Sequence, residues 1–186
     1  MDAPPGMLPL IFAIQKHVAI VSISASAVRG QGSPGIVSAA TRFLAVLSLQ
    51  PFGVGTQDGF QAALEDATDT LQMCLPPPAR SWGLARKCMN IFLRDCFYNG
   101  QLCTAYDLMA SSAFYEIPLD SIVAGSLQRL AGPALLPRWR GVKNLTRENS
   151  DAYQAFALSL SRQWNIGRVY LDTDLFIEGR RAAETC

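Results

Sequence analysis

Two residues of this chain, Lys87 and Asp120, are of types that can act together on a sugar carbon. Lys87 lies in the segment 81–90, where a glycine turn at Gly83 is expected to open an apolar helix. Asp120 follows Pro118 and precedes another apolar run, so a proline turn would present it at the start of a second helix. An amine can attack a sugar carbon, and a nearby carboxylate can stabilise positive charge on it. The pair therefore suits cleavage of an N-glycosidic bond.

Both residues also have ordinary structural explanations, which leave their roles open at this point. A lysine near a helix start is often a solvated surface residue, and an aspartate just ahead of an apolar helix is often only an N-cap. His17 is the single histidine and lies in an apolar stretch, so we expect a core residue. A Ser-His-Asp triad and a histidine-based metal site are thereby excluded.

Composition and charge indicate a folded chain with one basic region. Hydrophobic residues make up 49% of the 186 residues and charged residues 17%, which is ample for a core and argues against disorder. The net charge is only +1, but residues 80–147 hold nine basic and four acidic side chains and carry +5. We expect this region to form a surface that faces an anion such as nucleic acid.

Cysteine usage and hydropathy predict an intracellular protein. The five cysteines are odd in number and include no C-x-x-C pair, so we expect neither a disulfide framework nor a zinc site. Gln15, Lys16 and His17 interrupt the apolar stretch 7–23 too early for a membrane span, and no basic region precedes it as in a signal peptide. A cytoplasmic protein with no membrane association is expected.

The hydrophobic pattern predicts a compact all-α fold. Apolar residues recur at helical spacing, and segments rich in glycine or proline separate these runs. The segment 169–177 is ambiguous between strand and helix, and a closing helix is favoured because the rest is helical. We expect a single domain over residues 1–186, in one or two helical lobes, with helices at 8–24, 35–49, 57–75, 84–98, 104–109, 120–130, 148–164 and 169–177.

The order of Gly-Leu-Ala-Arg-Lys at 83–87, an apolar helix and Ile-Pro-Leu-Asp-Ser-Ile-Val at 117–123 resembles the helix-hairpin-helix superfamily of DNA glycosylases. The resemblance covers about residues 76–135. It implies that Lys87 is the family's nucleophilic lysine and Asp120 its catalytic aspartate. Their spacing of 33 residues is closest to the archaeal 8-oxoguanine glycosylase branch. The chain is also similar to small bacterial glycosylases proposed to attack phage DNA that carries glucosylated hydroxymethylcytosine.

Two departures from the family pattern bear on these implications. The usual hairpin has Gly-x-Gly, whereas Ala85 stands where the second glycine would be. Some members hold an iron–sulfur cluster with four clustered cysteines near the C-terminus, where this chain has only Cys186. We therefore expect a modified hairpin, no cofactor and no metal.

Further side chains are candidates for contact with DNA and with a base turned out of the helix. Gln31, beside Arg29 in a glycine-rich loop, could fill the gap left by a flipped base or touch that base, although a plain surface turn explains the loop equally well. Trp82, Trp139 and Tyr98 are candidates to stack on a base, with core packing as the alternative. The remaining candidates for substrate or phosphate contact are Gly83, Arg86, Asn90, Arg138, Arg140 and Lys143.

These observations predict a monomeric DNA glycosylase that hydrolyses the N-glycosidic bond of a modified base in double-stranded DNA and leaves an abasic site. The resemblance implies an oxidised purine or glucosylated hydroxymethylcytosine as the base, in repair or anti-phage defence, and an associated AP lyase step through Lys87. Two other classes stay open. A non-catalytic helical DNA-binding module predicts that Asp120→Asn changes nothing, and a helical protein-interaction domain predicts no salt-dependent DNA binding.

Overall fold

The structure, a computed structural model, describes residues 7–31 and 34–184, and this part of the chain contains eight α-helices and no strand. The prediction of an all-α fold is confirmed. None of the described helices combines the length and the hydrophobicity that crossing a bilayer requires. The α-helices are α1 (Met7–Ser22), α2 (Ile36–Leu44), α3 (Gln57–Cys74), α4 (Trp82–Tyr98), α5 (Gly100–Ala105), α6 (Ser121–Ala131), α7 (Arg147–Gln163) and α8 (Arg168–Glu184).

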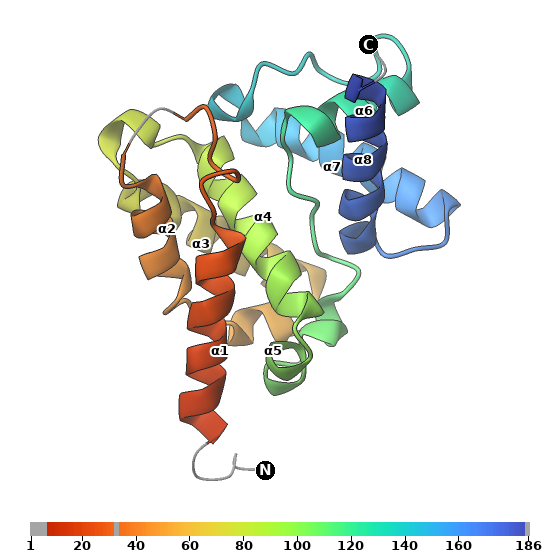
Figure 1. Cartoon of the computed structure of the whole chain (residues 1–186). Coiled ribbons are helices and arrows are strands. Elements are labelled where there is room, and N and C mark those ends of the chain that lie inside the picture. Colours follow the sequence, from red (N-terminus) through yellow and green to blue (C-terminus); the bar gives the residue numbers. More distant parts are fainter. Residues whose placement is uncertain (1–6, 32–33, 185–186) are drawn as a thin grey trace.

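The helices are arranged in two groups, α1 to α5 and α6 to α8 (Figure 1). The buried side chains form two hydrophobic clusters that follow this division. The first lies mostly among α1 to α5, with Phe60 and Phe92 fully buried in it. The second lies among α6, α7 and α8 around Tyr153, and Trp82 from the start of α4 joins it. Each fully buried large apolar side chain stabilises the fold by about 1.5–3 kcal/mol relative to exposure. We call these groups the N-terminal and C-terminal lobes.

Helix α4 is the element shared by both lobes, and it passes between them in Figure 1. Ser81 caps its first turn, since the Ser81 Oγ accepts a hydrogen bond from the Leu84 backbone N–H at 3.3 Å. Cys88 and Cys96 are fully buried on its inner side. Burial raises the pKa of the Cys88 thiol to about 12, so this cysteine is neutral and packs as a small hydrophobic residue.

The glycine turn predicted at Gly83 is wrong, because α4 already begins at Trp82 and Gly83 lies inside its first turn. The glycine is needed for packing. A Cβ at this position would lie 2.3 Å from the Val142 carbonyl oxygen and 2.7 Å from the Leu145 Cβ. The backbone of residues 142–145 therefore rests directly on the start of α4, a contact that only a residue without a side chain permits.

Several helix boundaries also differ from those predicted. Helix α2 ends at Leu44 rather than at 49, because residues 45–49 leave the helix ahead of a 3-10 turn at Gln50–Gly53. The short helix expected at 104–109 lies earlier, at Gly100–Ala105, where the Asn99 side chain accepts from two backbone N–H groups and caps it. The ambiguous segment 169–177 is helical, as favoured, and belongs to the longer α8.

Replacing Gly83 by alanine should destabilise the fold strongly. The added methyl group would overlap the backbone of residues 142–145, and overpacking of this kind costs about 3 kcal/mol. Gly125→Ala in α6 is the matched control, because its added Cβ would have no neighbour within 4 Å. That variant should be stabilised by about 0.5–1 kcal/mol through helix propensity. Urea unfolding measures both, and equal stability of Gly83→Ala and wild type would contradict this packing.

Candidate active site

The fold brings Lys87 and Asp120 together from two different helices. Lys87 projects from α4, and Asp120 is the N-cap residue of α6. The Lys87 Nζ lies 3.7 Å from the Asp120 Oδ2, and the two side chains are 11% and 28% exposed. The same Nζ donates a hydrogen bond to the Ala27 carbonyl oxygen at 2.8 Å. The amine is therefore held in place from two sides while the carboxylate keeps contact with solvent.

Asp120 serves as a helix cap and as a partner of Lys87 with different oxygens. Its Oδ1 accepts hydrogen bonds from the backbone N–H groups of Ile122 at 2.9 Å and Val123 at 3.0 Å. Its Oδ2 makes the contact with Lys87. The positive end of a helix dipole favours a charged carboxylate at this position. The cap fixes the orientation of the carboxylate and leaves one oxygen for chemistry.

Lys87 and Asp120 line a cleft of ≈ 1160 Å³ whose walls come from both lobes. The N-terminal lobe contributes the end of α1, the following loop with Ala27, and one face of α4. The C-terminal lobe contributes the start of α6 and part of α8, with Gly141 and Val142 between them in sequence. Typical binding pockets for small ligands occupy about 300–1,000 Å³, so this cleft has room for a bulky group.

A second group of charged side chains lines the same cleft. Arg94 of α4 forms ion pairs with its neighbour Asp95 and with Asp172 of α8. Ser22 of α1 donates to Asp95 at 2.6 Å. Burial raises the pKa of Asp172 above its ordinary value, and Arg94 opposes this only in part. Burial alone would lower the pKa of Arg94, but Asp172 and Asp95 hold it above its usual range. Charged groups of both signs thus face any ligand in the cleft.

Sequence reasoning missed this group. Arg94 and Asp95 stand seven and eight positions after Lys87, so helical periodicity places all three on one face of α4. This helical spacing could have identified Arg94 and Asp95 from the sequence. Asp172 is 6% exposed and lines the cleft, whereas Asp174, on the same helix, is exposed.

The glycine-rich loop reaches the cleft as well. Arg29 and Gln31 both line it, and Arg29 is exposed. The Gln31 Nε2 donates a long hydrogen bond of 3.4 Å to the Arg29 carbonyl oxygen. Its Oε1 is buried and has no hydrogen-bond partner among the described residues. Gln31 therefore lies at the edge of the cleft with one side-chain oxygen unsatisfied by the described residues.

Comparison with known proteins adds no relative: no family model, no curated protein and no solved structure matches this chain. The helix-hairpin-helix relationship stays a prediction carried by residues 83–123. Within the described part of the chain, no group of three or more histidine, cysteine, aspartate or glutamate side chains could hold a metal ion.

Four residues predicted to touch substrate or DNA lie inside the protein instead. Trp82 is 8% exposed, and the guanidinium carbons of Arg86 and Arg147 each lie 5.2 Å from its ring centroid. Arg86 is 2% exposed and binds a buried carboxylate, and Asn90 donates to the same group. With Gly83, they are buried, and none of the four lines the cleft.

The other predicted contacts lie on the surface near the cleft. Arg138, Arg140 and Lys143 are exposed on the segment between α6 and α7, beside cleft-lining residues 141–142. Trp139 is half-buried and packs edge-on against Tyr153, so core packing explains it. Among the predicted aromatic contacts, Tyr98 lines the cleft, 46% exposed and stacked on Tyr170.

Acid should weaken the fold through the carboxylate that Arg86 and Asn90 bind, which is Glu116. Burial alone would raise the pKa of Glu116, but Arg86 and Asn90 hold it below its ordinary value of 4.5. A carboxyl whose folded pKa is lowered stabilises the protein above its unfolded pKa, and this contribution is lost as pH falls through the folded value. We expect the urea midpoint of wild type to fall below pH 4.5. Glu116→Gln should show a weaker dependence, and identical profiles would contradict this role.

Proposed function

We propose that this chain is a DNA glycosylase that cleaves the N-glycosidic bond of a modified base, with Lys87 and Asp120 as its catalytic residues. The observation that carries the proposal is the amine–carboxylate pair, 3.7 Å apart, at the wall of a cleft large enough for an extruded nucleotide. A base inside a duplex cannot be reached by such a pair, so the target nucleotide must rotate out of the stack into the cleft.

Asp120 would stabilise the charge that develops on the sugar. As the bond between C1′ and the base breaks, positive charge spreads over C1′ and the ring oxygen. A carboxylate held close to that carbon lowers the barrier without having to reorient. The two backbone N–H groups on Oδ1 supply this preorganisation, and the solvent contact of Asp120 also allows it to activate a water. Attack by that water would leave an abasic site.

Lys87 would add a second route to the same carbon. Its Nζ forms a bond to C1′ while the bond to the base breaks and the base leaves with the electron pair. Asp120 Oδ2 is the carboxylate oxygen that lies beside Nζ and can take the proton the amine releases. The ring oxygen then leaves C1′ and takes up a proton, which gives an imine between Lys87 and C1′. Loss of a C2′ proton to water allows elimination of the 3′ phosphate, and this cuts the strand. This is the AP lyase step.

The cleft favours a bulky modified base. Its volume of ≈ 1160 Å³ exceeds the usual range for ligand pockets, and a base needs only a fraction of it. The charged group of Arg94, Asp95 and Asp172 offers donors and acceptors for hydroxyl groups. We therefore rank glucosylated hydroxymethylcytosine ahead of an oxidised purine as the substrate.

The exposed basic residues beside the cleft should bind the DNA backbone. Replacing Arg138 and Lys143 by alanine is expected to weaken binding uniformly across DNA sequences. Each lost phosphate contact should flatten the plot of log affinity against log salt by about 0.9. Arg162→Ala is the matched control, because Arg162 is exposed at the end of α7, a helix that contributes no residue to the cleft. Fluorescence anisotropy over a salt series measures this, and an unchanged slope in the double variant would place the DNA elsewhere.

The function itself is tested by incubating the protein with duplexes that each carry one modified base. The panel contains 8-oxoguanine, uracil, an alkylated purine, and hydroxymethylcytosine with and without glucose. Breaks that appear only after alkali indicate base release, and breaks without alkali add the lyase step. DNA binding without breaks on any duplex would favour the non-catalytic DNA-binding module.

A further inference from the structure

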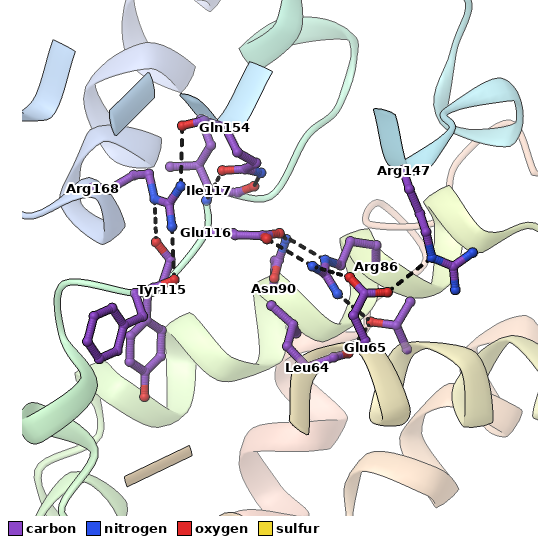
Figure 2. A network of polar contacts seen from close by, with 12 residues as sticks. Leu64, Glu65, Arg86, Asn90, Tyr115, Glu116, Ile117, Arg147, Gln154 and Arg168 are labelled. Atoms are coloured by element: carbon purple, nitrogen blue, oxygen red, sulfur yellow. Dashed lines mark hydrogen bonds and ion pairs between the residues drawn. The ribbon is translucent and has the colours of Figure 1, made fainter. Parts of the chain in front are cut away.

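The segment that leads into Asp120 is held by polar contacts on nearly every residue. Arg168 of α8 donates to the carbonyl oxygens of Tyr115 at 2.7 Å and Phe114 at 2.9 Å. The Gln154 amide of α7 holds both backbone groups of Ile117, accepting from its N–H at 3.1 Å and donating to its carbonyl at 2.8 Å. Figure 2 shows these contacts converging on residues 115–117. The C-terminal lobe thus fixes the backbone of this segment.

Glu116 ties the same segment to α4. Arg86 donates to it through Nε and Nη2, both at 2.9 Å, so that both carboxylate oxygens are bound in a forked pair. Asn90 donates to the Oε2 as well, at 3.0 Å (Figure 2). Arg86 also contacts Thr68 at 3.1 Å and Glu65 at 2.8 Å, both on α3. Glu116 and Arg86 are almost completely buried, so water does not compete for these bonds.

The two ends of this buried pair are next to the two proposed catalytic residues. Arg86 immediately precedes Lys87 in α4, and consecutive helical side chains point in directions about 100° apart, so one faces Glu116 and the other the cleft. Glu116 precedes Asp120 by four residues, and Pro118 stiffens the connection between them. Lys87 and Asp120 therefore have little freedom to move relative to Arg86 and Glu116.

We propose that Arg86 and Glu116 are positioning residues: their forked ion pair locks the start of α6 against α4 and thereby sets the separation of Lys87 and Asp120. The role in catalysis rests on the proposed glycosylase function. A buried ion pair adds little net stability compared with apolar residues of similar size, because its charges must be stripped of water. Its directional hydrogen bonds fix geometry, and a displacement of about 1 Å at a reacting centre can lower a rate 10²-fold.

Two variants test this without relying on one that fails to fold. Glu116→Gln removes the charge and one strong acceptor but keeps the shape. Arg86→Lys keeps a positive charge beside Glu116 but loses the fork, so the buried carboxylate is not left without a counter-charge. Asp69→Asn is the matched control, since Asp69 pairs with Arg147 on the exposed side of α3 and contacts neither residue. Circular dichroism and urea unfolding first establish that each variant is folded.

Two readouts then separate positioning from activity. The first is the ¹³Cε NMR signal of Lys87 in lysine-labelled protein, which Lys87→Gln assigns because the chain has only three lysines. Arg86→Lys adds a fourth lysine signal, and combining it with Lys87→Gln shows which of the two signals belongs to Lys87. The second is the single-turnover rate of base release, together with the affinity for DNA that carries an abasic-site analogue. We expect both variants to shift the Lys87 signal and to slow base release about 10–100-fold, with DNA affinity within about 2-fold. Asp69→Asn should change none of these.

An unshifted Lys87 signal in either folded variant would overturn the proposal, and so would rates equal to wild type. If Glu116→Gln does not fold, Arg86→Lys decides alone. If wild type releases no base from any duplex, the glycosylase function fails, while the NMR comparison still decides whether Arg86 and Glu116 set the position of Lys87.

Discussion

Asp120→Asn should abolish base release while leaving the fold and DNA binding intact. The asparagine keeps the Oδ1 that accepts from the N–H groups of Ile122 and Val123, and asparagine and aspartate are equally good N-caps. What the variant loses is the negative charge beside Lys87, which is the group proposed to stabilise the developing cation. We expect a fall of about 10³-fold or more in the single-turnover rate, with the free energy of unfolding within about 0.5 kcal/mol of wild type.

Asp120→Ala is the companion that separates the two roles of this residue. It removes the cap together with the charge, so it should lose about 1 kcal/mol of stability that Asp120→Asn retains. Both variants should be equally inactive. If Asp120→Asn releases the base at the wild-type rate, Asp120 is only a helix cap, and the non-catalytic DNA-binding class becomes the better description.

Much of the fold follows from local sequence signals. Helices are specified by hydrophobic spacing over three or four turns, which is why the all-α class and the long helices at 57–75 and 148–164 were predicted closely. The wrong predictions concern places where a segment distant in sequence determines the local structure. Glycine is typical of turns, yet Gly83 is a helical residue. A glycine is needed there because residues 142–145 pack directly against it, and the local sequence pattern does not reveal that contact. At the early end of α2 a distant side chain is involved, because the Gln15 amide of α1 donates to the carbonyl oxygens of Leu44 and Leu47.

The candidate site was predictable only in part, for a physical reason that α4 illustrates. Lys87 and Asp120 were chosen for their chemistry, and the fold places them 3.7 Å apart. The neighbours of Lys87 were assigned by proximity in sequence, but in a helix the residues next to each other face different directions. Arg86 therefore points into the protein, while Arg94, further along, shares the cleft with Lys87. Asn90 stands one turn after Lys87, but its side chain is buried and donates to Glu116. Asp172 joins the cleft through packing of α8 against α6, which periodicity alone does not reveal.

Lys87→Gln should eliminate the covalent complex with DNA. If the amine attacks C1′, borohydride reduces the imine and traps the protein on the strand, and glutamine cannot form that bond. Strand breaks without alkali should disappear with the adduct. Base release should itself fall about 10²-fold or more if the amine is the main nucleophile. Release at the wild-type rate would instead show that water attacks and that the lyase step is separate.

The small number of lysines makes this result easy to interpret. Lys16 and Lys143 are exposed, and neither lines the cleft, so Lys16→Gln and Lys143→Gln should keep the adduct. An adduct that survives in Lys87→Gln and is lost in one of these variants would move the nucleophile elsewhere. Lys87→Gln also removes the amine that faces Asp120. A crystal structure or NMR spectrum of the variant is therefore needed to show that Asp120 still caps α6. With the cap in place, loss of the adduct assigns the nucleophile to the Lys87 amine, because the other group at the reacting carbon is unchanged.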